Sequence, residues 1–408
     1  METAVCVNCI DDEHVAKHVR MEGSFAECSI CHGDEAKVFT VEQLCELIDP
    51  LIRKNFGQDE EGEPLSSVVQ EMLGQCFDFE EEIIAELVRI DPCDPRDGDE
   101  PFYDDTATYS EIRRRFSITH YYAQWDMLLE ELKHKRRFFS SSAKSMFSKI
   151  FDDVETLKSR DPDRNAWECV VCELPVGTRL FRARVCDSSA TLQLMFRAPF
   201  QQVGPVPSSR ARAGRMNAEG VTVLYCGRDA DTCLAELRPA LGVDAAVIEL
   251  SVKRPLRLLD FSRLERSYSG AKLSYFQPDF AEVVERGLFL RKLHNLISQP
   301  VTPGNEADYV ITQTMAEYLA HVHKPPFDGV LFKSVQRAEG VNVALFANPR
   351  FQEVAPIELF PVEYVDRSLT IHTTNSINYG HSKREFFISG DAVSLRRDGD
   401  FEYEEDDR

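Results

Sequence analysis

The sequence predicts an α+β protein, and three features along the chain lead to this fold class. Paired cysteines open the chain, apolar residues recur at helical spacing from Val38 to about Lys158, and short strand-like runs mixed with helices follow from Trp167. Strands and helices that mix without strict alternation favour an α+β arrangement. We therefore expect a cysteine-rich module at 1–36, a helical domain at 37–165, a mixed α+β domain at 166–378 and an acidic tail at 379–408.

The first module contains two C-x-x-C pairs, "CVNC" and "CSIC", which are separated by eighteen residues. Each pair closes a tight turn that directs two thiolates at one ion, and two such turns complete a tetrahedron. Because four protein ligands leave no open position, we expect a structural zinc ion that serves folding or docking. The predicted ligands are Cys6, Cys9, Cys28 and Cys31, with His14, His18 and His32 as nearby substitutes.

The next segment has the period of amphipathic helices. In "TVEQLCELIDPLI", Thr40 is a predicted N-cap with Gln43 three residues later, which is the pattern of a capping box. "EEEIIAELVRI" and the stretch from Ser110 to Phe139 continue the helical spacing, and the acidic, proline-containing segment Asp91–Asp105 between them predicts a loop.

The composition is that of a globular protein, with 43% hydrophobic and 28% charged residues. A formal net charge of −22 argues against a broad nucleic-acid surface, because phosphate binding requires clustered Lys and Arg. There is no run of eighteen apolar residues and no basic-then-apolar leader, so we expect neither a membrane span nor secretion. The C-x-x-C pairs among the 12 cysteines favour metal binding in a reducing cytoplasm over disulfides.

The mixed domain is predicted from six short runs rich in Val, Leu and Phe, with helical patterns between them. The predicted helices lie at Asp231–Leu241, Phe280–Ile297 and Asn305–His323, and Asp229 or Asp231 can cap the first of them. The predicted strands are "GTRLFRARV", "GVTVLYCG", "AAVIELSV", "LRLLDF", "FDGVLFKS" and "NVALFANP".

Polar side chains stand in three of these segments where a buried pattern would not need them. Arg182 and Arg184 lie on the same face of a predicted strand, and a guanidinium group suits a phosphate or a carboxylate. Tyr225 ends a second strand, and Glu236 lies on the helix that follows it. Ser334 ends a third strand. Taken singly, these residues fit a surface arginine pair, a solvated glutamate and an ordinary strand-end serine.

Together the three segments resemble the RES domain family, which takes its name from an arginine, a glutamate and a serine. The arginine strand comes first, and "GR-x-N-x-x-G-x-x-x-LY" with a downstream "LAE" follows. "Y-x-x-TQ-x-x-AEY", "FDG-x-x-x-KS" and "N-x-ALF" then appear in the order of the family. The resemblance covers roughly half of the chain. Its three name-giving residues match Arg182, Glu236 and Ser334, and Tyr225 is the matching aromatic residue.

RES domains are similar in fold to ADP-ribosyltransferases, and characterised members are toxins that consume NAD. The resemblance therefore implies an enzyme that cleaves the nicotinamide–ribose bond of NAD by hydrolysis or phosphorolysis. It implies that Glu236 stabilises the oxocarbenium-like ribose or holds a ribose hydroxyl group, and that Arg182 binds the pyrophosphate or an incoming phosphate. Tyr225 would stack on a ring, and Ser334 would hydrogen-bond the nicotinamide ribose or amide. Arg184 and Arg215 are further candidates for phosphate contact.

Three alternatives stay open. A protein side chain can accept the ADP-ribose unit, which would make the chain a protein ADP-ribosyltransferase. The helical region resembles the HEPN/RES N-terminal region, and "RFSITH" places Arg115 and His120 in the R-x4-H pattern of HEPN ribonucleases. The third alternative is a non-catalytic, zinc-dependent interaction protein.

About 165 residues precede the mixed domain. We expect this part to regulate the mixed domain or to dock a protein partner, which would itself be a regulatory or antitoxin-like protein. Cys169 and Cys172 lack a second pair at zinc spacing, and Cys186 is the only near candidate. We therefore interpret them as core or loop cysteines.

Overall fold

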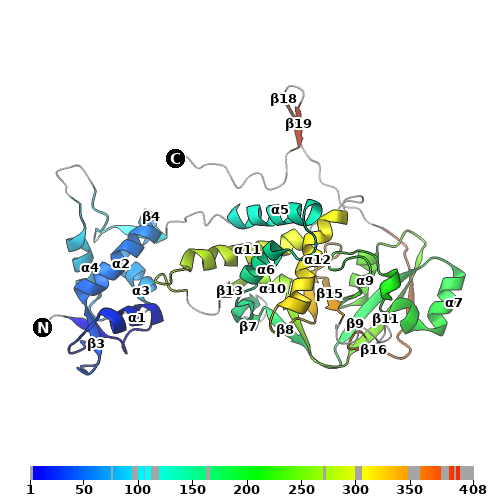
Figure 1. Cartoon of the computed structure of the whole chain (residues 1–408), viewed down its shortest axis with the longest axis horizontal. Coiled ribbons are helices and arrows are strands. Elements are labelled where there is room, and N and C mark those ends of the chain that lie inside the picture. The colour runs from blue at the N-terminus through cyan, green and yellow to red at the C-terminus, as the bar shows by residue number, and fades with distance from the viewer. Residues whose placement is uncertain are drawn as a thin grey trace.

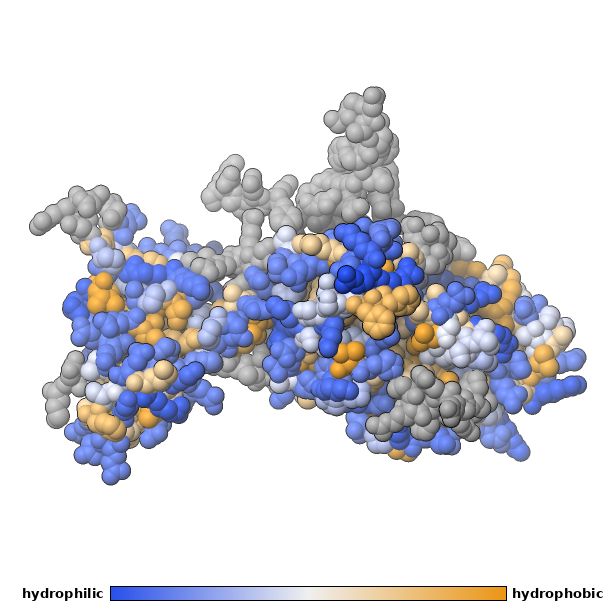
Figure 2. Space-filling model, viewed as in Figure 1, coloured by the Kyte–Doolittle hydropathy of each residue, from blue (hydrophilic) through white to orange (hydrophobic). Residues whose placement is uncertain are grey.

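A computed structural model describes most of the chain. The described residues are 3–74, 77–93, 100–104, 106–111, 119–161, 166–269, 273–298, 306–347, 359–377, 386–389 and 392–395. None of the helices in these ranges is both long enough and apolar enough to cross a lipid bilayer. Figure 2 shows hydrophilic residues over most of the visible face, with hydrophobic residues in small groups between them.

The N-terminal part combines a small sheet with four helices at one end of the molecule (Figure 1). Thr40 accepts a hydrogen bond from the Gln43 amide and Gln43 returns one to the Thr40 amide, so the predicted capping box is confirmed. The sheet has the order β1-β3-β2, with all pairs antiparallel. Its strands are β1 (Ala4–Cys6), β2 (Ser24–Phe25) and β3 (Lys37–Thr40), and the helices are α1 (Glu13–Glu22), α2 (Val41–Asn55), α3 (Leu65–Leu73) and α4 (Glu80–Ile90).

The expectation that residues 38–158 contain only helices and loops is wrong at β4 (Phe56–Pro64) and β5 (Thr108–Glu111), and strands β3 and β6 (Leu157–Asp161) also overlap the two ends of this range. Strand β4 pairs antiparallel with β5, and Tyr109 of β5 is buried. The polar sequence "FGQDEEGEP" of β4 has no apolar alternation, so its period does not predict a strand. The segment forms a strand because it pairs with β5, which is distant in the sequence.

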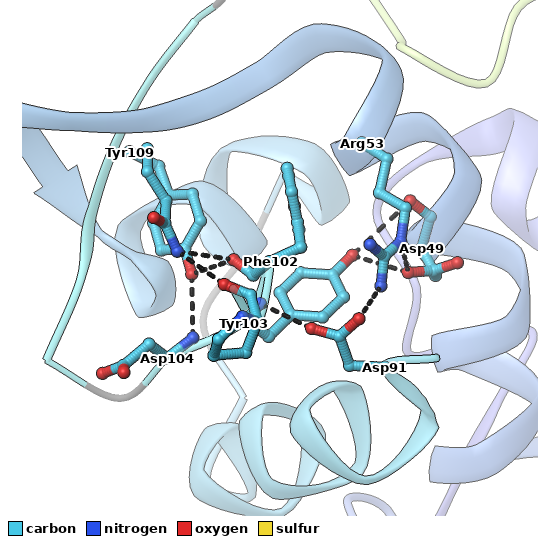
Figure 3. Close-up of polar contacts among 9 residues, drawn as sticks. Asp49, Arg53, Asp91, Phe102, Tyr103, Asp104 and Tyr109 are labelled. Atoms are coloured by element: carbon cyan, nitrogen blue, oxygen red, sulfur yellow. Dashed lines mark hydrogen bonds and ion pairs between the residues drawn. The ribbon is translucent and has the colours of Figure 1, made fainter. Parts of the chain in front are cut away.

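The acidic segment after α4 is a loop in its described residues, as predicted, and it is fixed to α2 through Arg53 (Figure 3). The Arg53 guanidinium group lies 2.7 Å from Asp49 Oδ1 and 3.0 Å from Asp91 Oδ1. Its Cζ stands 4.7 Å and 4.8 Å from the ring centroids of Phe102 and Tyr103. The Tyr103 hydroxyl group donates to Asp49 Oδ1, and its amide donates to Asp91 Oδ2. This network joins the segment after α4 to helix α2.

Helices α5 (Thr119–His134) and α6 (Ser141–Ile150) belong to a different hydrophobic cluster from helices α1–α4. Trp125 of α5 and Phe147 of α6 pack with Phe289 of α11 (Phe280–Ser298), beside one face of the main sheet. The helices of residues 37–165 therefore contribute to two cores, and the boundaries expected between the domains stay predictions.

The main sheet is mixed and carries all six predicted strands, which confirms the α+β fold class of this half. Its order is β16-β11-β9-β10-β15-β14-β12-β8, and β17 pairs with β11 beside this path. Only the β12–β14 pair is parallel among these described strands. The strands are β8 (Val171–Leu174), β9 (Arg179–Cys186), β10 (Val223–Gly227), β11 (Asp244–Val252), β12 (Leu256–Asp260), β14 (Gly329–Lys333), β15 (Val341–Phe346), β16 (Val362–Tyr364) and β17 (Thr370–Thr373).

Alternation along the central strands divides the core between the two faces of the sheet. Val223 and Ala344 join the cluster of helices α5, α6, α11 and α12, whereas Leu224 and Val343 join the cluster that contains α7 and α8. The helices are α7 (Ser189–Arg197), α8 (Pro199–Val203), α9 (Ala230–Leu237), α10 (Phe261–Leu264) and α12 (Val310–Glu317), with 3-10 turns at Val154–Thr156, Ser208–Arg210 and Glu306–Tyr309 and a π turn at Tyr318–Val322. All three predicted helices of this half are present.

Two smaller strand groups complete the description. Strands β6 (Leu157–Asp161), β7 (Ala166–Cys169) and β13 (Ser267–Ser269) form a sheet of order β13-β6-β7, and β18 (Phe386–Ser389) pairs with β19 (Ala392–Leu395). The last acidic run, residues 398–408, lies outside the described residues.

Candidate active site

A cavity of about 630 Å³ opens where strands β9 and β10 separate. These two strands, described over their full lengths, pair only through Phe181 and Gly227. The cavity wall brings together four of the residues predicted from the sequence, which are Arg182, Arg215, Tyr225 and Glu236. Ser334 reaches the same place through a hydrogen bond to Glu236, whereas Arg184 is not among the described residues that line the cavity.

Arg182 bridges the gap between β9 and β10. Its Nε donates to the carbonyl groups of Val203 and Gly204, at 2.9 and 3.1 Å, and its Nη1 donates to the carbonyl group of Tyr225. Burial lowers the pKa of Arg182, and no carboxylate in the described part of the chain pairs with it. Arg182 is half-buried, and a cation that is partly removed from water without a counter-charge is costly, so this guanidinium group favours an anion in the cavity.

Arg184 lies on the same face of β9 as Arg182, as predicted, because their partners on β11 are Ala246 and Ile248 of one cluster. Burial, and then the charges of Arg182 and Arg210, lower the pKa of Arg184. The prediction that Arg184 and Arg182 share a face of the strand is therefore confirmed. Arg184 is nevertheless not among the described residues that line the cavity.

Tyr225 lines the cavity, and its hydroxyl group is held by two hydrogen bonds. The hydroxyl group donates to Asn217 Oδ1 and accepts from the Met216 amide, each at 2.9 Å. A Cβ atom at Gly214 would stand 2.8 Å from Asn217 Oδ1 and 3.0 Å from the Tyr225 hydroxyl oxygen, so the close approach requires glycine there. Burial raises the pKa of Tyr225 to about 12, which keeps the phenol neutral. Tyr225 does not end its strand as predicted, because β10 continues to Gly227.

Glu236 lies in the last turn of α9, whose N-cap is Asp229 and not Asp231. The Cys233 thiol, one turn earlier, donates to the carbonyl group of Phe181 and so anchors the helix on β9. Ser334 Oγ donates to Glu236 Oε1 at 2.6 Å, and Asn342 Nδ2 donates to the same oxygen at 2.7 Å. Segments almost a hundred residues apart therefore meet at one carboxylate oxygen.

Ser334 follows β14 directly and begins a tight connection to β15. Its amide donates to the Gly340 carbonyl group at 2.7 Å, and its Oγ accepts from the amides of Gln336 and Arg337 at 3.1 and 3.2 Å. The Arg337 side chain pairs with Asp229 at 2.7 Å, which joins this connection to the start of α9.

Arg215 lies opposite, on the loop that holds Tyr225. Its Nη1 donates to the carbonyl group of Ile297 in α11, and its Cζ stands 5.8 Å from the ring centroid of Tyr309. Thr312 and Gln313 of α12 hold the loop through the carbonyl groups of Arg215 and Gly214. Cationic, acidic and aromatic residues thus line one cavity, and helix α12 holds the loop that carries Arg215.

A family model named RES domain matches residues 179–367. These residues form a RES domain. The match lies within the predicted range 166–378 and includes every predicted residue of the cavity. No curated protein and no solved structure matches the chain significantly.

The sequence alone did not assign several residues of the RES domain cavity. Asn342 is the most informative, because it is a buried polar residue inside the otherwise apolar strand "VNVALF". That interruption, together with its place in the motif "N-x-ALF", was the available signal. Tyr309, Lys333 and Arg238 also line the cavity. Tyr309 and Lys333 lie in the motifs "Y-x-x-TQ-x-x-AEY" and "FDG-x-x-x-KS", which were the available signal, whereas no motif marked Arg238.

The N-terminal cysteines form a second candidate site. The four Sγ atoms lie within 4.8 Å of one another, and those of Cys6 and Cys31 are 3.7 Å apart. Tetrahedral Zn–S bonds of about 2.3 Å separate sulfur atoms by about 3.8 Å, so the arrangement fits one metal ion. The four cysteines are those predicted, and this group includes none of the three nearby histidines.

The remaining sequence candidates do not form a site among the described residues. Arg115 lies outside them, and His120 is exposed with Nε2 2.8 Å from Gln124 Nε2. Cys169 is exposed and Cys172 is half-buried, and neither belongs to a metal-binding group found in the described ranges.

Proposed function

We propose that the RES domain cleaves the nicotinamide–ribose bond of NAD, as a glycohydrolase or a phosphorylase. The observation that carries this proposal is one cavity that combines the half-buried guanidinium group of Arg182, which has no carboxylate partner among the described residues, with the carboxylate of Glu236 and the aromatic residue Tyr225. A dinucleotide offers the matching groups, which are a pyrophosphate, a ribose that becomes cationic and a flat ring. A toxin or defence role is the biological setting that the RES family suggests.

The reaction breaks the bond between the pyridinium nitrogen and C1′ of the nicotinamide ribose, the carbon that is numbered 1″ in ADP-ribose. The electron pair of this bond goes to the nitrogen, so nicotinamide leaves as a neutral molecule and positive charge develops on the ribose. Water then adds its oxygen to C1′ and releases one proton, which yields ADP-ribose. Inorganic phosphate that adds in place of water yields ADP-ribose 1″-phosphate.

The residues of the cavity suit the charges of this reaction. The carboxylate of Glu236 stabilises the developing positive charge on the ribose, because a fixed opposite charge needs no reorganisation during the reaction. The remaining N–H groups of Arg182 bind pyrophosphate oxygens, and Arg215 and Arg238 are further cations on the wall. The Tyr225 ring stacks on a base or on nicotinamide.

A protein acceptor is the second candidate outcome. Glu236 lines the cavity and is exposed to solvent, which leaves room for a protein side chain as well as for water to approach. Transfer to a protein differs from hydrolysis only in the atom that reaches C1′.

One incubation separates these outcomes. The purified chain is mixed with NAD, with and without phosphate, and the products are analysed by mass spectrometry. ADP-ribose indicates hydrolysis, ADP-ribose 1″-phosphate indicates phosphorolysis, and a mass increase on a protein indicates transfer. Glu236→Gln is expected to abolish all three, whereas Glu219→Gln, an exposed residue outside the cavity wall, serves as the control. Equal activity of Glu236→Gln and the parent would refute the assignment.

For the N-terminal part we propose a structural zinc ion at Cys6, Cys9, Cys28 and Cys31 and a regulatory or docking role. The sulfur spacing supports zinc, and thiolates of this kind suit the reducing cytoplasm, where we place the protein. The packing of RES-domain residues Tyr275 and Phe276 in the core of helices α1–α4 supports a regulatory connection.

A further inference from the structure

Asn342 holds an unusual place for a polar side chain. It lies in the central strand β15, opposite Gly227 of β10 and Phe332 of β14, and only 7% of its surface is exposed. Because β15 is paired on both sides, the backbone at Asn342 is fixed with little freedom. A buried amide in such a strand is costly unless it is hydrogen-bonded, and its Nδ2 donates to Glu236.

The two donors of Glu236 meet at a single oxygen. Asn342 and Ser334 both donate to Oε1, whereas Oε2 accepts no hydrogen bond from the described residues. Two donors from two different segments fix both the position and the rotation of a carboxylate, which one donor would leave free to turn. Oε2 is therefore the oxygen left for a ligand.

The hydroxyl group of Ser334 is fully used in this arrangement. Its oxygen accepts from the amides of Gln336 and Arg337, and its one proton is donated to Glu236. The role expected from the family resemblance, a hydrogen bond from Ser334 to nicotinamide or its ribose, would require this proton to leave the carboxylate.

We propose that Asn342 is a positioning residue for the NAD cleavage proposed above, and that with Ser334 it fixes Oε1 of Glu236 so that Oε2 alone meets the ribose. The inference rests on that proposed function for its kinetic consequence. The geometric part of the inference, that Asn342 and Ser334 hold the Glu236 carboxylate in one rotation, does not depend on the proposed function.

Asn342→Leu removes the donor while keeping the size of the side chain, and we expect kcat to fall about 10- to 100-fold with little change in KM.

Asn342→Asp places a second carboxylate against Oε1, so the acid limb of the pH–rate profile should move to higher pH. The pair Ser334→Ala and Asn342→Leu should be non-additive, because either loss already frees the carboxylate. Asn55→Leu is the matched control. Asn55 is also a buried asparagine, and its Nδ2 donates to the Leu51 carbonyl group. It lies at the end of helix α2 in the N-terminal part and does not line the cavity.

The decisive second measurement does not depend on turnover. In a crystal structure of the full-length Asn342→Leu chain, we expect the Glu236 carboxylate to have rotated or to occupy two conformers. A carboxylate unchanged in that structure overturns the proposal, as does parental kcat in Asn342→Leu. If the parent chain does not consume NAD, the proposed function falls, and the crystallographic result alone decides whether Asn342 positions Glu236.

Discussion

The Tyr275 hydroxyl group donates a hydrogen bond to Oε1 of Glu71 over 2.9 Å, which joins the RES domain to helix α3. The Tyr275 ring packs 5.6 Å from Phe56, between ring centroids, within the core of the N-terminal part. Helix α11 begins a few residues later, and near its other end Ile297 accepts from Arg215 of the cavity. Helix α11 therefore packs against the N-terminal core at its start and holds Arg215 of the cavity wall near its end. Figure 1 shows the helix running from the N-terminal part towards the RES domain.

This connection predicts that Tyr275→Ala weakens the attachment of the N-terminal part. Loss of a buried aromatic side chain should lower the free energy of unfolding by about 3 kcal/mol or more. Tyr275→Phe, which loses only the hydroxyl group, should cost about 1 kcal/mol. Urea denaturation measures both variants. If the N-terminal part regulates the RES domain, Tyr275→Ala also changes the rate of the NAD cleavage proposed above, and an unchanged rate would count against regulation by this route.

The contacts of Arg182 predict a requirement for its shape as well as its charge. Arg182→Lys keeps a cation but loses the fork that reaches three carbonyl groups, so ADP-ribose should bind about tenfold more weakly or worse. Arg184→Lys is the matched control on the same strand, outside the cavity wall, and should bind close to the parent. Isothermal titration calorimetry measures both. An equal loss in the two variants would contradict the separate places of these arginines.

His294 predicts a loss of stability in mild acid. Burial lowers its pKa from the ordinary 6.5, and its neutral Nε2 accepts from the amide of Lys333, next to Ser334. Below pH 6.5 the unfolded chain therefore takes up a proton that the folded chain resists, and stability falls as the pH falls towards the folded pKa. The melting temperature of His294→Gln should depend less on pH between 7.5 and 5.5 than that of the parent. Parallel curves for the two proteins would rule out this contribution.

The cysteine cluster predicts one zinc ion per chain, measurable by elemental analysis of the purified protein. Removal by a chelator, or Cys9→Ser, should lower hydrogen-exchange protection in β1, α1 and β3, because the metal joins the turns at the two cysteine pairs. Cys45→Ala is the control: Cys45 is buried in the adjoining core, so this variant should be destabilised yet keep its metal. Full exchange protection after metal loss would show that the site does not support the fold.

Much of the fold could be predicted because its signals are local. The capping box at Thr40, the six strands of the main sheet and the helix that carries Glu236 all follow from residues within a few positions of one another. Strand β4 could not be predicted, since its polar residues form a strand only against β5, some fifty residues later. Local periodicity contains no information about such a partner.

The candidate site divides in the same way. The motifs placed Arg182, Tyr225 and Glu236 on their elements, and the structure brings them to one cavity. The contacts of these residues could not be predicted, because hydrogen bonds of Arg182 to three carbonyl groups and of Asn342 to Glu236 depend on how distant strands pack. The same holds for Arg184, whose position beside Arg182 in the sequence does not bring it to the cavity wall.

The sequence by itself determined most of the element types, the cysteine cluster and the match to the motifs of the RES domain, since period, capping and motif spacing are properties of neighbouring residues. Only the tertiary structure decided which oxygen of Glu236 is held, which arginine lies in the cavity and where Tyr275 packs. These outcomes depend on contacts between segments far apart in the chain, whose geometry is set by the packing of the whole core.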